Sequence, residues 1–357
     1  MELLVAVALL VLVLAFSGII FKVSIESYRT ASANAEIMQK LRVITDQLNA
    51  DFKGLQKDAP LMVWFQQDPA DLNQRYDQIM FFAVGDFQST QLYDGLFGAK
   101  APALTGQPIR GNIARNYYGQ AMVFSSTTGP TGSFVYPWLQ RFETAPDKML
   151  NIRARTLARR QHILTADTSL FFFPIIADVN NFSRANNDRF EHDSIALAQW
   201  KAIAGEPNNV GNNKIVDICF GNRPQIDIQN PVPIGLHMLM CQGVGSVSVQ
   251  WEYPYNLEYR WWPSSDPDGN PGTRDSDFDP NAMNMNQFGM YFNMPDGVNH
   301  TLYWYGPEHA KTQAQPGSQI FPPSFYPRAL KFTFTLYDSK NIIKGGRRFT
   351  HIVYLEN

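Results

Sequence analysis

Apolar residues fill the start of the chain almost without a break. From Leu3 to Phe21 only Ser17 and Gly18 interrupt a run of Leu, Val, Ala, Ile and Phe. An α-helix rises about 1.5 Å per residue, so residues 3–23 would measure about 30 Å, the thickness of the hydrocarbon core of a bilayer. The pattern therefore predicts that residues 1–23 form the transmembrane half of a helix.

A cleaved secretory signal is the alternative interpretation of this segment. Such a signal has a basic start, a shorter apolar run and a small-residue cleavage site close behind it. Here residue 2 is an acid, and the small residues Ala31–Ala33 come well after the apolar run. These features favour a membrane anchor that is kept in the protein.

The helix is predicted to continue beyond the membrane as an amphipathic half over residues 24–57. There is no proline between Lys22 and Lys57, and the only glycine is Gly54. Apolar residues recur at helical spacing on one side, opposite polar residues, so this half needs a surface to pack against. The predicted packing residues are Ile37, Leu41, Ile44, Leu48, Phe52 and Leu55.

The remaining residues, 58–357, show short β-like runs separated by Gly, Pro and Asn. Ile79–Val84 is continuously apolar, whereas residues 245–253 alternate between apolar and polar residues as half-buried strands do. Residues 329–338 and 347–356 also alternate, and the glycines in the segment between them suit a hairpin connection. The predicted fold class is therefore α+β, with a long N-terminal helix packed on a domain of antiparallel sheet.

The block ELLVAVALLVLVL, its amphipathic continuation and the β-rich remainder together resemble type IV pilins and type II secretion pseudopilins. In that family the helix follows a cleaved leader, the new N-terminus is methylated, and a glutamate near it neutralises the terminal amine of a neighbouring subunit. The resemblance implies this role for Glu2. An unpaired acid at apolar depth costs about 2.5–3.5 kcal/mol, so a cationic partner would be needed there. An interfacial position of Glu2 is the alternative that the residue itself leaves open.

Three further segments, LRVITDQLNADFKGL, ARTLARRQHIL and GVGSVSVQWEY, and the final hairpin are similar to J-type minor pseudopilins and W-type minor pilins. The resemblance implies a pilin-like structural subunit that assembles through its helix with other pilin or pseudopilin subunits. It also implies a single-pass protein of the inner membrane, whose C-terminal domain lies in the periplasm or outside the cell. Residues 86–110, 176–230 and 254–324 are interpreted as large loop insertions on this core.

Composition and motifs exclude several other classes of function. The formal net charge is −2 and 17% of the residues are charged, which gives no electrostatic basis for binding nucleic acid. The basic cluster Arg153–Arg160 is interpreted as a solvated face, with a docking patch as the alternative. No nucleophile, phosphate-binding or zinc-protease motif occurs, and the histidines are scattered, so no enzymatic activity is expected.

One loop could bind a metal ion. Residues 265–281 carry acids at alternating positions, and calcium prefers several oxygen ligands from such a turn-rich segment. The loop lacks the glycine and the closing glutamate of an EF-hand, so a solvated acidic loop is the alternative. The candidate calcium ligands, and the only cofactor expectation, are Asp266, Asp268, Asn270, Asp275, Asp277 and Asp279.

Two further features keep alternatives open. Cys219 and Cys241 are the only cysteines, and they form either one disulfide in an oxidising compartment or two buried thiols. The aromatic groups at residues 259–263 and 302–306 are either core or a binding surface. In the second case the chain would be a membrane-anchored adhesin, or a carbohydrate- or protein-binding module, that uses Trp261 and Trp262.

Overall fold

The structure is a computed structural model of the 357-residue chain. It describes residues 2–68, 71–92, 106–125, 133–135, 155–164, 191–193, 196–198, 200–201, 225–226, 239–255, 258–262, 290–293, 299–305 and 327–355.

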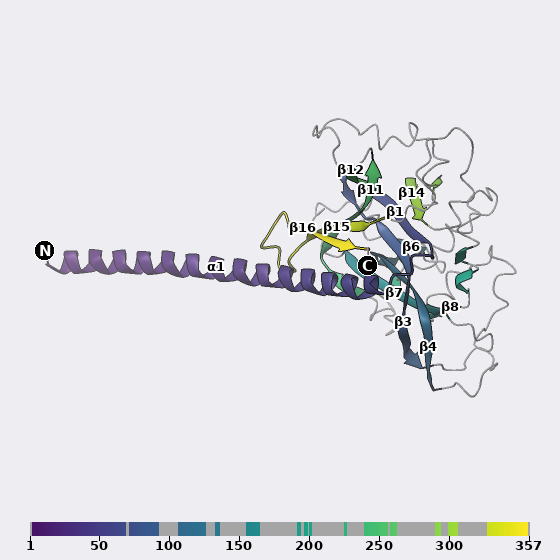
Figure 1. Ribbon diagram of the computed structural model, residues 1–357. Helices are drawn as coiled ribbons and strands as arrows, with labels where there is room; N and C mark the ends of the chain where they lie inside the picture. The colour runs from purple at the N-terminus through teal and green to yellow at the C-terminus, as the bar shows by residue number, and fades with distance from the viewer. Residues whose placement is uncertain are drawn as a thin grey trace.

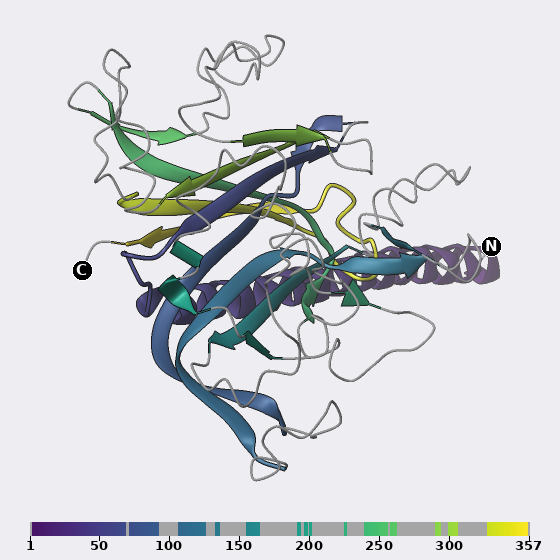
Figure 2. The ribbon, with the colours of Figure 1, turned by 90° about the vertical axis from the view of Figure 1, so that its right-hand side faces the viewer.

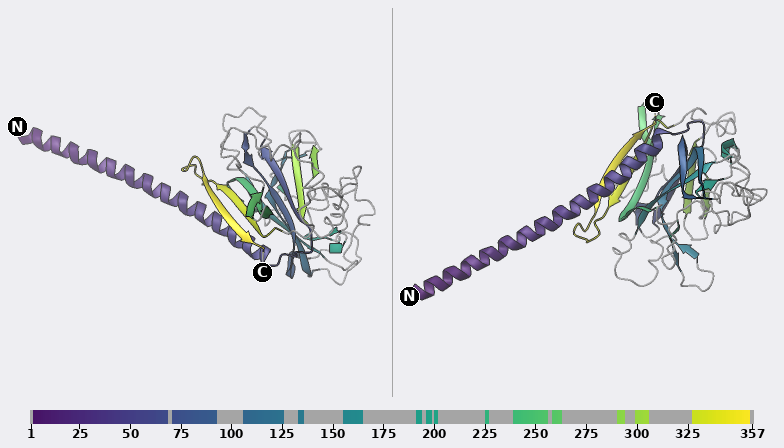
Figure 3. Two further views of the ribbon diagram at one scale, coloured as in Figure 1. Left: turned by 45° about the horizontal axis from the view of Figure 1, so that its top comes forward. Right: turned by 90° about the horizontal axis from the view of Figure 1, so that it is seen from below.

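A single long helix, α1 (Glu2–Lys53), carries the N-terminus far away from the sheets (Figure 1; Figure 3). Its 52 residues correspond to about 78 Å at the usual rise of an α-helix. The helix is unbroken, as the absence of proline predicts. The C-terminal part lies against the strands, and the N-terminal part extends beyond them in every view.

The helix ends at Lys53 rather than at residue 57 as predicted. The reason is a backbone contact that is distant in sequence. The amide of Val84 donates to the carbonyl of Gly54 at 2.7 Å, and the amide of Gln56 donates to the carbonyl of Phe82 at 2.8 Å. A Cβ atom on residue 54 would lie 2.3 Å from the Val84 carbonyl oxygen, so only glycine permits this approach. Leu55 therefore lies just after the helix, in an isolated bridge to Ala83.

The described strands belong to three sheets. The strands are β1 (Leu61–Asp68), β2 (Asp71–Arg75), β3 (Gln78–Leu92), β4 (Pro108–Gln120), β5 (Met122–Ser125), β6 (Ser133–Val135), β7 (Thr156–Leu164), β8 (His192–Asp193), β9 (Gln225–Ile226), β10 (Leu239–Gln242), β11 (Val244–Tyr255), β12 (Glu258–Trp262), β13 (Met290–Asn293), β14 (Asn299–Tyr305), β15 (Ala329–Leu336) and β16 (Arg347–Tyr354). A nine-stranded sheet has the order β10-β7-β4-β3-β1-β14-β13, with β2 and β8 beside it. A four-stranded sheet has the order β12-β11-β15-β16, and β6-β5-β9 form a small third sheet. The described pairs are antiparallel except for β5 with β9 and β7 with β8.

The final hairpin forms as the alternating sequence predicts. Strands β15 and β16 pair along their whole length, from Ala329 opposite Tyr354 to Leu336 opposite Arg347. The apolar positions of β15 are buried in the core, and Lys331 and Thr335 on its other face are partly exposed.

One hydrophobic core joins α1 to both large sheets, and Figure 2 shows α1 beside the strands of these sheets. Phe52 shows this arrangement most directly. Its ring stacks on Phe81 of β3 with the centroids 4.0 Å apart, and it lies 5.8 Å from the ring of Phe332 in β15. The architecture is therefore α+β, with one long apolar N-terminal helix and mainly antiparallel sheets.

All three of the segments interpreted as insertions contribute to the body of the fold. Within residues 254–324, strands β13 and β14 extend the nine-stranded sheet beside β1, and β12 pairs with β11 in the four-stranded sheet. Strand β3 extends to Leu92 and β4 begins at Pro108, so both ends of residues 86–110 belong to the nine-stranded sheet. Trp200, inside residues 176–230, is fully buried against Phe82, with ring centroids 5.7 Å apart. Periodicity alone did not identify these residues because their neighbours in space are distant in sequence.

Candidate functional site

The first half of α1 has an apolar surface that no described part of the chain covers. Every residue from Glu2 to Ser32 is exposed except Ser17, which is partly exposed. Large side chains such as Leu3, at 79% exposed, and Phe21, at 70%, project without a partner in the part of the chain that the structure describes. Soluble proteins rarely leave so large an apolar surface uncovered, so another phase or another molecule must cover it.

This helix is long enough and apolar enough to cross a membrane, and none of its most apolar stretch is buried. Among the described residues it is the only such helix. Glu2 lies in its first turn, where the partial positive charge of the helix N-terminus favours an acid.

The second half of the same helix packs onto the sheets through the predicted positions. Ile37, Ile44, Leu48 and Phe52 are buried in the shared core, and Leu41 packs against it. Leu55 also packs against the core, although it follows the helix. The polar residues on the opposite side of the helix are exposed, namely Arg42, Asp46, Asn49 and Lys53.

A buried ion pair fixes the end of the helix to the nine-stranded sheet. Both oxygens of Asp51 accept hydrogen bonds from Arg159 of β7, at 2.6 Å from Nε and 2.8 Å from Nη2. The hydroxyl of Tyr118 in β4 donates to the same carboxylate, and Gln47 donates to it at 3.0 Å. The Asp51 side chain is only 6% exposed. Two strands and the helix are thus joined at one carboxylate.

The surroundings shift the acid–base equilibria of this cluster. Burial, followed by the charge of Asp51, raises the pKa of Tyr118 well above its ordinary value. Burial opposes the charged form of Arg159, but its hydrogen bonds to Asp51 and the charge of that residue outweigh burial and raise its pKa. The phenol therefore stays neutral and the guanidinium stays charged at physiological pH.

Sequence reasoning missed Asp51, although its position gave a signal. Asp51 follows Leu48 by three residues and Ile44 by seven, so it lies on the apolar side of the amphipathic helix. An acid on the packing side of a helix needs a buried cation or several hydrogen-bond donors, and the basic cluster Arg153–Arg160 could have supplied them.

The interpretation of that basic cluster as a solvated face is wrong for its described residues. Arg155 and Arg160 are fully buried in and beside β7, and the side chain of Arg159 is 20% exposed. Arg155 donates to the carbonyl of Gly245 at 2.7 Å, and its guanidinium lies 4.4 Å from the centroid of the Tyr76 ring. These arginines connect elements within the fold.

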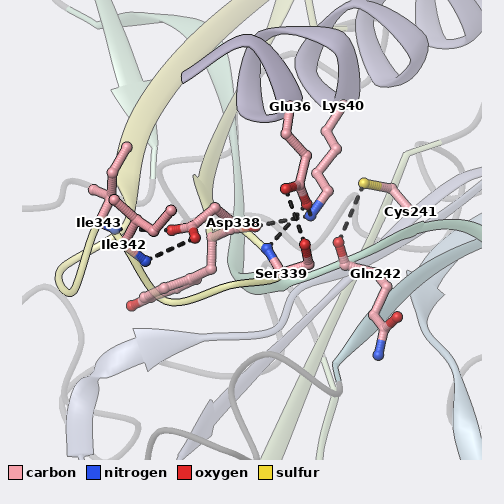
Figure 4. Close-up of polar contacts among 9 residues, drawn as sticks. Glu36, Lys40, Cys241, Gln242, Asp338, Ser339, Ile342 and Ile343 are labelled. Carbon is pink, nitrogen blue, oxygen red and sulfur yellow. Dashed lines mark hydrogen bonds and ion pairs between the residues drawn. The ribbon is translucent and has the colours of Figure 1, made fainter. Parts of the chain in front are cut away.

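A second polar contact holds the β15–β16 connection against the middle of α1 (Figure 4). Glu36 forms an ion pair with Lys40 at 2.8 Å. The backbone amide and the hydroxyl of Ser339 donate to its two oxygens at 2.9 and 3.0 Å. Lys40 in turn donates to the carbonyl of Tyr337 at 2.8 Å. Partial burial disfavours the charge of Glu36, but the bonds from Lys40 and Ser339 outweigh it and lower the pKa of Glu36.

Gly243 allows the chain to pass close to this contact. Its φ is +83°, and an added Cβ would lie 2.8 Å from the Tyr337 carbonyl oxygen and 3.1 Å from Lys40 Nζ. Beside it, the thiol of Cys241 is buried, and burial raises its pKa to about 11. Cys241 is a free thiol in the structure, while Cys219 lies outside the described residues.

The other predicted sites have different outcomes. The candidate calcium loop, residues 265–281, lies outside the described residues, so calcium binding stays a prediction. The described part of the chain contains no cluster of three His, Cys, Asp or Glu side chains placed to hold a metal ion. Trp261 is partly buried, and Lys331 Nζ lies 4.7 Å from the centroid of its ring. His351 bonds to Asn49 of α1 at 2.9 Å, in keeping with a structural role.

Comparisons with known proteins give no match: no family model fits the chain, and no curated protein or solved structure is similar to it. The functional argument therefore depends on the residues and their geometry.

Proposed function

We propose that this protein is a pilin-like structural subunit, which is anchored in a membrane by residues 3–23 and assembles with related subunits through the exposed half of α1. One observation carries the proposal. A single unbroken helix is buried on one side from residue 33 onward and is exposed on all sides before it. A helix with one half exposed on all sides can leave lipid and pack against similar helices while the β-rich part remains in water.

The closest functional assignment is a minor subunit of a type II secretion pseudopilus or a type IV pilus. The resemblance of the opening block and the final hairpin supports it. In this proposal Glu2 meets a cation, such as the terminal amine of a neighbouring subunit, when the apolar helix enters the assembly. An acid with no partner at that depth would cost about 2.5–3.5 kcal/mol, so the pairing would also fix the register between subunits.

The experiment compares insertion with assembly. The full chain is produced in bacterial membranes with a cysteine in the exposed half, for example Leu12→Cys, and oxidative crosslinking between helices is measured. Because the apolar run is unchanged, Glu2→Val should leave the protein in the membrane but strongly reduce crosslinking. Glu26→Gln removes an exposed acid elsewhere on α1 and serves as the matched control. Undiminished crosslinking of the Glu2→Val protein would refute the pairing.

The alternative of a membrane-anchored binding module shares the same helix but needs an accessible aromatic surface. In the described part of the chain, Trp261 is partly buried and the ammonium of Lys331 lies over its ring. A ring already covered by a cation has one face fewer for a sugar. The described side chains therefore offer no specific observation in favour of this alternative, and the side chain of Trp262 lies outside them.

A further inference from the structure

The connection between β15 and β16 is strongly basic. Residues 339–348, here called the basic connection, are the part of the connection after Asp338 together with the first two residues of β16, and they contain four cations and no acid. Each of these cations is exposed, and they are Lys340, Lys344, Arg347 and Arg348. The hairpin interpretation explains the glycines of this segment but gives no reason for its charge.

The basic connection has a defined shape. Just before it, the buried carboxylate of Asp338 accepts the amides of Ile342 and Ile343 at 2.8 and 2.9 Å. Two left-handed residues, Asn341 with φ of 56° and Gly346 with φ of 65°, complete the turn. Because the Asp338 carboxylate is buried and bonded to backbone amides of the turn, it is shielded from solvent. The four cations, by contrast, are exposed.

The helix positions this segment at the end of the β-rich part that faces the N-terminus (Figure 1; Figure 3). Ser339 bonds to both oxygens of Glu36, which fixes the connection beside the middle of α1 (Figure 4). Ala33 is the first helix residue that is buried, so the packed part of the protein reaches at least to that position.

The distance from this position to the membrane is short. From Val23 to Ala33 the helix rises about 15 Å. The headgroup layer occupies about 5–8 Å of that distance on each side of the hydrocarbon core, which leaves about 7–10 Å. This gap is similar to the Debye length of about 8–10 Å at physiological salt, and long Lys and Arg side chains shorten it further. The contact of Ser339 with Glu36 places the basic connection about 4.5 Å farther along the helix than Ala33, which is less than the length of an extended Lys or Arg side chain. The cations therefore lie within electrostatic reach of the lipid surface.

We propose that the basic connection docks on anionic phospholipid headgroups of the leaflet from which α1 emerges. Charge complementarity and position together select this partner: four exposed cations, beside a turn whose acid Asp338 is buried, face the surface at which α1 leaves the bilayer. Docking would hold the β-rich part close to the membrane and limit the tilt of α1 before assembly. The inference rests on the proposed membrane insertion of residues 3–23.

A fluorescent reporter can measure this docking. A Cβ atom at Gly345 would have no neighbour within 4 Å, so Gly345→Cys should carry an environment-sensitive fluorophore without disturbing the turn. The full chain is placed in vesicles of phosphatidylcholine with or without phosphatidylglycerol. Labelled protein without Gly345→Cys gives the background from the native cysteines.

The expected result is a change in emission that requires phosphatidylglycerol and disappears at high salt. Each cation near an anionic surface should favour the docked state by about fivefold. The combined variant Lys340→Gln, Lys344→Gln, Arg347→Gln and Arg348→Gln should therefore lose the response. Lys53→Gln with Lys57→Gln and Arg110→Gln removes exposed cations elsewhere and should keep it. Inorganic phosphate added to neutral vesicles should produce no response.

Several outcomes would overturn the proposal. The first is a change in emission that is as large in neutral vesicles as in vesicles with phosphatidylglycerol. The second is a change in emission that remains in the combined variant. The third is a change in emission that requires a high density of protein copies and not anionic lipid. The last result would identify a second copy as the partner of the basic connection. Alkaline carbonate extraction of the same vesicles separates the two levels. Extracted protein contradicts the membrane insertion and the docking together, whereas retained protein without a response contradicts the docking alone.

Discussion

The buried contact of Asp51 with Arg159 should dominate the attachment of α1 to the sheets. Replacing Asp51 by alanine removes the acceptor of both guanidinium bonds, at 2.6 and 2.8 Å, and of the Tyr118 hydroxyl. Arg159 then remains largely buried without its counter-charge. Breaking one partner of such a pair costs about 3–5 kcal/mol. The free energy of unfolding should fall by that amount.

The assay is urea unfolding of the full chain in detergent, followed by tryptophan fluorescence. The matched control is Asp46→Ala, because Asp46 forms an ion pair on the same helix with Arg42 at 3.5 Å, but both side chains are mostly exposed. An exposed pair contributes about 0–1 kcal/mol, so the control should lose no more than that.

A double variant tests the electrostatic reason directly. Asp51→Leu combined with Arg159→Met removes both charges and keeps apolar volume, so it should be more stable than Asp51→Ala alone. The reasoning is refuted if Asp51→Ala loses less than about 1 kcal/mol, as an exposed pair would. It is also refuted if the free energy of unfolding that the double variant loses equals the sum of the losses in Asp51→Leu and in Arg159→Met.

Three further predictions concern the same region of the fold. The pKa of Glu36 is lowered below its ordinary value of 4.5, so its contact with Ser339 should stabilise the fold above that pH and lose this effect as the pH falls below 4.5. Glu36→Gln should remove that part of the pH dependence of the melting temperature. Gly54→Ala should lower the free energy of unfolding by about 1–3 kcal/mol in urea titrations, because its Cβ would lie 2.3 Å from the Val84 carbonyl oxygen. Gly18→Ala, which has open space around it, should lower the free energy of unfolding by less than about 1 kcal/mol. The Cys241 thiol, whose pKa burial raises to about 11, should react slowly with iodoacetamide at neutral pH and quickly after unfolding. If Cys241 does not react after unfolding in the absence of reductant, it instead forms a disulfide with Cys219.

Local patterns predicted the helix and the final hairpin well, because short-range periodicity determines both. The apolar run, the one-sided stripe through Ile37 and Ile44, and the alternation of β15 all appear in the structure at the expected places. The position of the helix end was wrong because Gly54 meets the backbone of Val84 across the sheet. Such a contact leaves no periodic signal near either residue.

The buried charges were also beyond local patterns. Asp51 and Arg159 are 108 residues apart, and Arg155 bonds to a carbonyl 90 residues away. A basic sequence is usually solvated, so composition favours the exposed interpretation unless a buried partner is known. For the apolar half of α1, by contrast, the sequence and the structure agree, since no described segment covers it.

The central claim is that one continuous helix has an apolar half removed from water by lipid or neighbouring helices and a second half attached to a solvated β-rich part. Cysteine labelling in intact membranes with a membrane-impermeant maleimide tests this most directly, using Leu12→Cys and Ala50→Cys, both at positions exposed in the isolated chain. The account predicts rapid labelling at residue 50 and protection at residue 12 until the membrane is dissolved by detergent. Equally rapid labelling at both positions in intact membranes would contradict it.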